Sequence, residues 1–307
     1  MSNVHRLGDY YQLPTSNNNR NQQQQRANPQ DKIPFYFMAR QADGDPKQEN
    51  FLKMLKIVFC PQIKLFSFTT GLTILIWVLF LTVIIVGGVD TNGTLLQTQL
   101  NTMKNFGCNN TLLVYKGEVY RLTSAIFLHW NFIHILFNSI ALLSFLSFME
   151  NAYGLLRSAL IFIIGGIGGN IFSDLCKQNT PEAYSAGAST SLFALIGAWI
   201  AFVILNWQGL KNLYGSQIRC MMLCMVMMNG FFIFMLSSIS VYGGGQESTD
   251  GYGHLGGFLT GIWIGLIIPK PLEFSNFSKN CKFIGMALYG TWFLLCFVLF
   301  YTTSDLK

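Results

Sequence analysis

Seven long stretches of this chain contain no lysine, arginine, aspartate or glutamate, and this pattern constrains the fold more than any other feature. The stretches are residues 65–89, 122–149, 158–173, 183–210, 220–246, 251–269 and 283–304. A membrane-spanning helix needs roughly 20 predominantly apolar residues, because in hydrocarbon only a helix or a closed barrel satisfies its own backbone. The third stretch is short, but residues 152–156 extend it through Arg157, whose long side chain can reach the headgroups. The sequence predicts an all-α membrane protein with seven spanning helices.

The composition and the placement of basic residues agree with a chain that lies mostly in lipid. Of its 307 residues, 51% are hydrophobic and 11% are charged, whereas soluble domains carry about 25% charged residues. The net charge of +6 does not indicate nucleic-acid binding, because 15 of the 20 lysines and arginines fall on one side of the predicted membrane. The positive-inside rule therefore predicts a cytosolic N-terminus and, after seven spans, a luminal or extracellular C-terminus.

The chain divides into four predicted regions. Residues 1–50 are polar and rich in Asn and Gln, which predicts a disordered cytosolic tail, and residues 51–64 resemble a basic amphipathic segment on the membrane surface. Residues 65–269 form a predicted six-helix core, and residues 283–304 an additional seventh helix. A mitochondrial presequence is the alternative for the tail, which has arginines and few acids but lacks a clear amphipathic helix.

Two other features concern the predicted outer side of the membrane. Cys108 and Cys176 both fall there, and they either pair or remain free thiols. Asn92 and Asn109 begin Asn-X-Thr sequons on the same side, which permits glycosylation without demonstrating it.

Three of the four histidines, His129, His134 and His254, lie in the apolar stretches. Polar residues inside a membrane are costly and indicate function by default, although a single histidine can be a packing residue. His134 and Asn138 are four residues apart, so they share a helix face and can both donate hydrogen bonds into the bundle. Two such donors resemble an oxyanion hole, and an interhelical polar clamp is the alternative.

Ser189 lies at the outer start of the fourth predicted span, directly after Gly187 and Ala188. Small residues let the backbone turn sharply and leave the hydroxyl accessible. A Gly-x-Ser sequence alone is a weak signal, and other hydroxyl groups nearby are Ser185, Thr190 and Ser191.

His254 stands at the outer end of the sixth predicted span. Small residues follow it at four-residue spacing: Gly257, Gly261 and Gly265. Such a stripe permits close helix packing. If the stripe meets Gly197 and Ala198 of the fourth span, His254 reaches the depth of Ser189 and can take the proton of its hydroxyl. A metal site built from the histidines is the rival chemistry, but no HExxH or comparable ligand cluster accompanies them, so neither a metal nor another cofactor is expected.

Several motifs, in order along residues 65–268, resemble the rhomboid family of intramembrane serine proteases. They are Gly117–Arg121 in the first loop, His129–Asn138, then Glu150 and Gly154, and finally Gly253–Gly261. The resemblance implies that Ser189 is the nucleophile and His254 the base, while His134, Asn138 and the Ser189 backbone bind the oxyanion. It assigns site support to Gly187, Phe193, His129, Gly257 and Gly261, and structural roles to Glu118, Arg121 and Glu150.

The serine motif departs from the family's commonest form, because it reads GAST where GASG is usual. Thr190 is therefore expected to narrow the space beside the oxyanion hole. Phe193 stands where tyrosine is frequent, and its ring is expected to stack on His254. The departure at Thr190 motivates an alternative, a rhomboid-fold protein that binds membrane clients without cutting them. A channel or transporter is a further alternative.

The resemblance implies an intramembrane serine endopeptidase that cleaves transmembrane or juxtamembrane segments of single-span membrane proteins. The helix after the six-helix core resembles the six-plus-one layout of the secretory-pathway branch, which favours a secretory compartment or the plasma membrane over mitochondria. Substrates are expected to enter near the fifth span, past Phe231, Phe232 and Phe234, and residues 241–252 are expected to cap the site.

Overall fold

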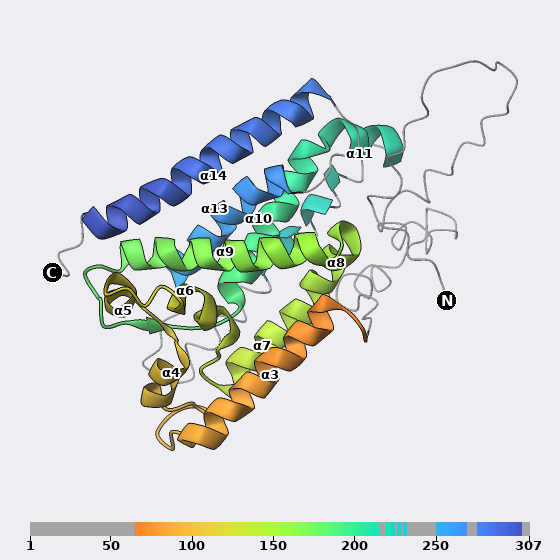
Figure 1. Cartoon of the computed structure of the whole chain (residues 1–307). Coiled ribbons are helices and arrows are strands. Elements are labelled where there is room, and N and C mark those ends of the chain that lie inside the picture. The colour runs from red at the N-terminus through yellow and green to blue at the C-terminus, as the bar shows by residue number, and fades with distance from the viewer. Residues whose placement is uncertain are drawn as a thin grey trace, which may run out of the picture.

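The structure is a computed structural model that describes residues 65–214, 219–220, 222–224, 226–228, 230–231, 250–268 and 275–302. The described part of the chain is mostly helical (Figure 1). A two-stranded antiparallel sheet joins β1 (Asn109–Asn110) to β2 (Tyr184–Ser185). The predicted tail and amphipathic segment, most of the fifth span including Phe232 and Phe234, and most of the expected cap lie outside the described residues.

The described helices fall into spanning helices and short connecting ones. In chain order they are α3 (Phe68–Gly87), α4 (Leu100–Phe106), α5 (Thr111–Tyr115), α6 (Arg121–Ser124), η2 (Ala125–Phe127), α7 (Phe132–Ala141), η3 (Leu142–Leu146), α8 (Ser147–Tyr153), α9 (Leu155–Cys176), α10 (Ser189–Leu205), α11 (Trp207–Tyr214), α13 (Gly251–Ile267) and α14 (Asn276–Thr302). Four are long and apolar enough to cross a membrane: α3, the continuous Phe132–Asn151 helix, α9 and α14. With the 17-residue helices α10 and α13, they make an all-α membrane bundle.

The second spanning helix begins later than its charge-free stretch. That stretch starts at residue 122, but residues 121–127 form the short helices α6 and η2, and α7 begins at Phe132. Asn131 caps α7, because its side chain accepts a hydrogen bond from the His134 N–H at 2.8 Å and so satisfies a free donor of the first turn. The charge-free stretch thus shows which residues can lie in the membrane, whereas the capping residue Asn131 shows where the spanning helix begins.

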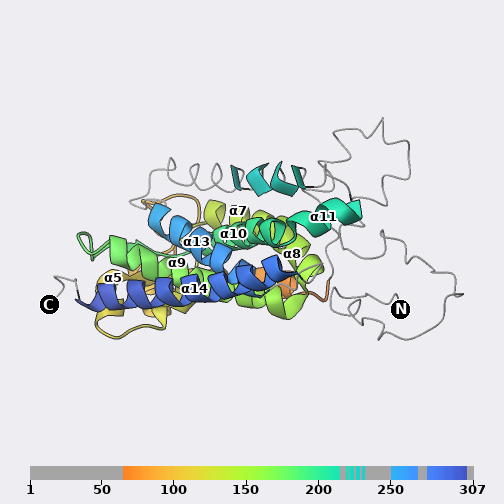
Figure 2. The ribbon, with the colours of Figure 1, turned by 90° about the horizontal axis from the view of Figure 1, so that it is seen from above.

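Helices α9, α10 and α13 pack closely in the middle of the bundle, and Figure 2 shows α10 and α13 side by side. Glycines allow the backbones of α10 and α13 to touch. The positions where an added Cβ would overlap the facing backbone pair Gly261 with Ala194, Gly265 with Ala198, and Gly197 with Phe258. This is the meeting of the two spans that the four-residue spacing predicts.

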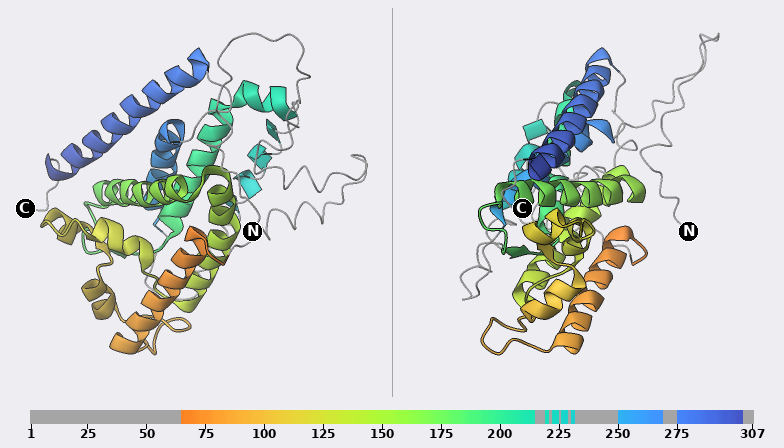
Figure 3. Two further views of the ribbon diagram at one scale, coloured as in Figure 1. Left: turned by 45° about the vertical axis from the view of Figure 1, so that its right-hand side comes forward. Right: turned by 60° about the vertical axis from the view of Figure 1, so that its left-hand side comes forward.

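Helices α3 and α14 lie on opposite sides of the bundle (Figure 3). Both turn large apolar side chains outward, among them Ile85 and Leu294, as lipid-facing helices do. Helix α14 also contacts the core, because the Trp292 indole N–H donates a hydrogen bond to the Thr260 hydroxyl of α13 at 3.2 Å. The additional helix is therefore joined to the helix that carries His254.

Glu118 and Arg121 fix the connection between α3 and α7. The buried Arg121 side chain contacts Glu118 at 2.7 Å and donates to the carbonyl oxygens of Lys104 at 2.8 Å and Cys108 at 3.0 Å. The hydrogen bond from Arg121, aided by that from Tyr120, lowers the pKa of Glu118 below its usual value. One guanidinium thereby holds three points of a long loop together.

Glu150 joins α8 to the start of α3. Its carboxylate accepts hydrogen bonds from the backbone N–H groups of Phe68 and Thr69, each at 2.9 Å, and from the Thr69 hydroxyl at 2.8 Å. The first turn of a helix has unpaired N–H groups and favours an anion. Gly154, with φ +81°, then turns the chain from α8 into α9.

The cysteines and sequons of the predicted outer side differ in accessibility. Cys108 and Cys176 are free thiols, and Cys108 is buried. Asn109 is also buried, and its side-chain amide donates to Asp174 at 2.8 Å, whereas Asn92 is exposed. In the folded chain only the Asn92 side chain of these two sequons is accessible.

Candidate active site

Ser189 is the first residue of α10, and the backbone before it leaves room for little but glycine. Gly187 has φ +144°, a conformation that residues with a side chain rarely adopt. A Cβ at this position would lie 2.7 Å from Cε1 of the His134 ring. The Gly187 N–H donates to the Ala125 carbonyl oxygen at 2.9 Å, which fixes the turn to η2.

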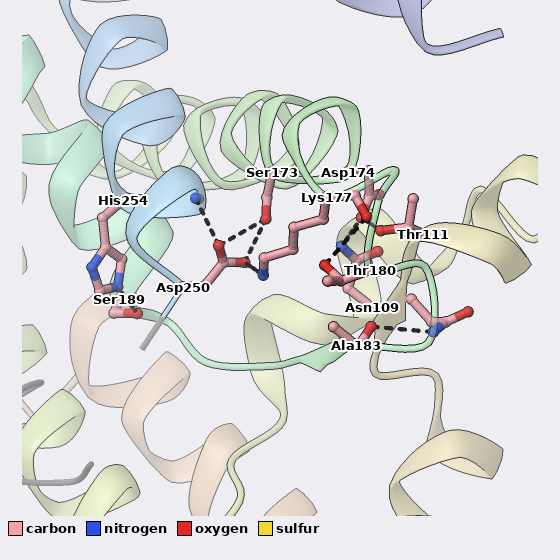
Figure 4. Close-up of polar contacts among 12 residues, drawn as sticks. Asn109, Thr111, Ser173, Asp174, Lys177, Thr180, Ala183, Ser189, Asp250 and His254 are labelled. Carbon is pink, nitrogen blue, oxygen red and sulfur yellow. Dashed lines mark hydrogen bonds and ion pairs between the residues drawn. The ribbon is translucent and has the colours of Figure 1, made fainter. Parts of the chain in front are cut away.

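The structure brings Ser189 and His254 into hydrogen-bond contact (Figure 4). His254 lies in the first turn of α13, and its Nε2 is 2.8 Å from the Ser189 Oγ. Both residues are largely buried, with 9% and 8% of their surfaces exposed. A serine hydroxyl becomes a strong nucleophile when a hydrogen-bonded base takes its proton. The contact therefore has the geometry of an activated serine.

Phe193 orients the imidazole from one turn further along α10. Its ring stacks on His254 with the centroids 4.5 Å apart and an interplanar angle of 20°. Ser189 and Phe193 are four residues apart and thus project from one helix face. One face of α10 therefore supplies both the Ser189 hydroxyl and the Phe193 ring that stacks on His254.

His134 borders the same space as the Ser189 hydroxyl. Its Nε2 lies 2.8 Å, and the Ser189 Oγ 3.7 Å, from the point that a Cβ at residue 187 would occupy. Asn138 projects from the same helix, but its amide donates to the His134 carbonyl oxygen at 2.9 Å. An asparagine amide has two N–H groups, so this bond leaves a second donor.

His129 packs behind His134. It is buried with 1% exposed, and its ring meets that of His134 edge to face, with the centroids 5.2 Å apart. Within the described part of the chain, neither of its ring nitrogens has a hydrogen-bond partner. Its contact with the site is therefore through His134 rather than with Ser189.

A protein-family model described as "Rhomboid domain" matches residues 116–271, which is half of the chain. The chain belongs to the rhomboid family. With its long apolar helices, it is a multi-pass membrane protein of that family.

The chain is similar to rhomboid-like proteins of Arabidopsis thaliana and Toxoplasma gondii. The chain is 33% identical over 174 residues to "RHOMBOID-like protein 5" of Arabidopsis thaliana, covering 57% of this chain and 52% of the relative. It is 31% identical over 222 residues to "Rhomboid-like protease 1" of Toxoplasma gondii, covering 72% and 70%. It is 32% identical over 169 residues to "RHOMBOID-like protein 6, mitochondrial" of Arabidopsis thaliana, covering 55% and 50%. The matched region thus spans about half the length of both plant relatives.

Thr190 of this rhomboid does not lie where the sequence predicts. Its methyl group faces Gly169 of α9 and Gly257 of α13, and its hydroxyl faces Gly253. The side chain therefore fills the junction of three helices, and the expectation that it narrows the space beside Ser189 is wrong. Successive helical residues point about 100° apart, so Thr190 faces different neighbours from those of Ser189.

Asp250 is the residue near the rhomboid site that the sequence reasoning missed. It caps α13, and its carboxylate accepts hydrogen bonds from the Gly253 N–H at 2.9 Å and from Ser173 at 2.7 Å, and pairs with Lys177 at 2.9 Å (Figure 4). Burial opposes its charge, but Lys177 and the hydrogen bonds outweigh burial and lower the pKa of Asp250. An aspartate just before an apolar helical stretch is a capping signal that could have identified it.

Proposed function

We propose that this rhomboid is an intramembrane serine endopeptidase with Ser189 as nucleophile and His254 as general base. The observation that carries the proposal is the 2.8 Å contact between His254 Nε2 and Ser189 Oγ. Ser189 attacks the carbonyl carbon of the scissile peptide while His254 takes the hydroxyl proton. His254 then gives this proton to the leaving amine, and water, activated by the same imidazole, hydrolyses the acyl-enzyme.

The oxyanion of the tetrahedral intermediate forms beside Gly187, between Ser189 and His134. The Ser189 N–H belongs to the first turn of α10, whose N–H groups have no partner within the helix. His134 and the second N–H of Asn138 are the side-chain donors. Loss of one such donor typically lowers kcat by about 100- to 1,000-fold.

The substrates proposed are transmembrane or juxtamembrane segments of single-span membrane proteins. Ser189 and His254 stand at the starts of two apolar helices that are packed within the bundle, so a client segment in the same bilayer reaches them at membrane depth. The name of the Toxoplasma relative, a protease, supports a hydrolytic role. We place this enzyme in a secretory-pathway or plasma membrane, with the site near the luminal or extracellular face.

Co-expression with a tagged single-span membrane protein tests the proposal. The unmodified chain is expected to release a fragment, and Ser189→Ala to release none. Ser191→Ala is the matched control, because this serine is also buried in α10 but faces Gly166 of α9. It is expected to cleave like the unmodified chain.

A fluorophosphonate probe adds a second measurement, because it reacts with activated serines. Labelling is expected in the unmodified chain and in Ser191→Ala but not in Ser189→Ala. Identical fragment patterns with and without Ser189 would refute the protease. If the unmodified chain binds the client but neither cleaves it nor reacts with the probe, the result would instead support a non-cutting client-binding protein. If the unmodified chain neither reacts with the probe nor binds the client, the result would favour a channel or transporter.

A further inference from the structure

The helix that carries His254 begins at a buried ion pair with another spanning helix. Asp250 accepts a hydrogen bond from the Gly253 N–H, and the His254 N–H donates to the Asp250 carbonyl oxygen at 3.0 Å. The side chain and the main chain of Asp250 therefore together fix the first turn of α13, which carries His254. A cap of this kind fixes where the helix starts and which way its first side chains point.

The same carboxylate is tied to the end of α9. Ser173 donates to it at 2.7 Å and Lys177 pairs with it at 2.9 Å. Only 15% of the Lys177 side chain and 11% of the Asp250 side chain are exposed. A buried carboxylate is unfavourable unless it is paired and hydrogen-bonded, so removing Lys177 leaves an uncompensated charge at the start of α13.

The pair also sets the charge near the imidazole. Asp250 precedes His254 by one helical turn, a separation of about 6 Å between Cβ atoms. From α7 the neighbouring group is His134, and from α10 it is the hydroxyl of Ser189. The acid of α9, Asp174, is bonded instead to Asn109 and Thr111, with contacts of 2.8 and 3.1 Å.

We infer that Asp250 is a positioning residue for His254, and that its ion pair with Lys177 links the end of α9 to the reactivity of the catalytic base. The inference rests on the proposed function, since it concerns the same Ser189–His254 pair. The Asp250 carboxylate bonds to Ser173, Lys177 and the Gly253 N–H rather than to the Ser189 hydroxyl, so it acts through the first turn of α13.

The test is the dependence of kcat/KM on pH for variants that each remove one charge of the pair. Asp250→Asn keeps the shape and a capping oxygen but removes the negative charge, which disfavours the protonated imidazole. The acid limb of its profile is expected to move to lower pH by roughly one unit, for one charge about 6 Å away at an effective dielectric near 40. Lys177→Met removes the positive charge, and its acid limb is expected to move to higher pH by a smaller amount, because Lys177 lies beyond Asp250 from His254 (Figure 4).

The opposite shifts of the acid limb expected for Asp250→Asn and Lys177→Met distinguish a role in positioning His254 from a general contribution to the stability of the fold. A purely structural ion pair would lower the activity of both variants without moving either limb, and that result would overturn the inference. If Asp250→Asn does not fold, Asp250→Ser takes its place, because serine is also a good capping residue and carries no charge. The acid limb of the Asp250→Ser profile is expected to move to lower pH, as for Asp250→Asn. Glu182→Gln, an exposed carboxylate in the loop before β2, is the control and is expected to leave the profile unchanged.

The outcome for the unmodified chain separates this inference from the proposed function. If the unmodified chain does not cleave, or if Ser189→Ala cleaves equally well, the protease itself is refuted. If the unmodified chain cleaves, Ser189→Ala does not, and the Asp250 and Lys177 variants share the unmodified profile, only the positioning role is refuted.

Discussion

Gly187 connects three parts of the active site through one backbone position. Its N–H is bonded to Ala125 of η2, its positive φ turns the chain into α10, and the space left by its missing side chain is taken by the His134 ring. The relative positions of Ser189, the proposed nucleophile, and His134, a proposed oxyanion donor, therefore depend on a residue that has no side chain. Such a site tolerates only very small displacements of its reacting groups, because a shift of about 1 Å can lower the rate about 100-fold.

Gly187→Ala is expected to lower the rate of substrate cleavage by about 100-fold or more, because the new methyl group displaces His134 and strains the turn before Ser189. Fluorophosphonate labelling of Ser189 and cleavage of the tagged substrate measure the effect. Gly71→Ala in α3, where an added methyl group meets no atom within 4 Å, is the control and should remain active. A fully active Gly187→Ala variant would contradict this account of the turn.

At the scale of the element, α13 is fixed on three sides. Its glycines lie against the backbone of α10, Asp250 ties its start to α9, and Thr260 accepts a hydrogen bond from Trp292 of α14. Apolar burial does not drive helices together in lipid, where the tails are as apolar as leucine, so close packing and polar contacts carry the association. The distance between Ser189 and His254 is the result of these contacts between helices.

Gly261→Val is expected to separate α13 from α10, because the new side chain would overlap the Ala194 backbone. Overpacking of this kind typically costs about 1–3 kcal/mol of stability, and the serine–histidine contact should lengthen. Thermal unfolding in detergent and the cleavage assay should both show a loss. Gly290→Val in α14, where an added Cβ meets nothing within 4 Å, should change neither; equal behaviour of the two variants would argue against the packing described.

At the scale of the whole molecule, the helices divide into a central group and a peripheral group. The Phe132–Asn151 helix and α9 are about half buried by the protein, whereas α3 and α14 are mostly exposed along their spans. A peripheral helix in lipid needs an apolar surface all round, and α3 meets this requirement by exposing residues such as Ile74 and Ile85. The basic residues, which the sequence predicts to lie mostly on one side of the spans, are expected to orient the bundle.

A tag at the N-terminus is expected to be cytosolic and a tag at the C-terminus luminal or extracellular, because 15 of the 20 basic residues then lie inside. Protease digestion of sealed vesicles from the secretory pathway, cytosolic face outward, should remove the N-terminal tag and spare the C-terminal one. Detergent should make both accessible. Protection of the N-terminal tag, or loss of the C-terminal one without detergent, would contradict seven spans with the N-terminus inside.

The features that the sequence determined by itself are local and periodic. Charge-free stretches long enough to cross a bilayer predict spanning helices, and three glycines at four-residue spacing, Gly257, Gly261 and Gly265, mark one face of one helix. The contact of Gly261 with Ala194 is a consequence of that spacing. The motif around Ser189 and His254 likewise predicted the pair that the structure brings to 2.8 Å.

The tertiary structure decided what depends on the rotation and depth of neighbouring helices. Thr190 was expected beside the oxyanion site, but the rotation of α10 turns it into the junction with α9 and α13. Asp250 meets Ser173, 77 residues earlier in the chain, only because α9 ends at the depth where α13 begins. Helical periodicity is fixed by the backbone of each segment, whereas such pairings are fixed by how the segments pack, and packing is a property of the assembled bundle.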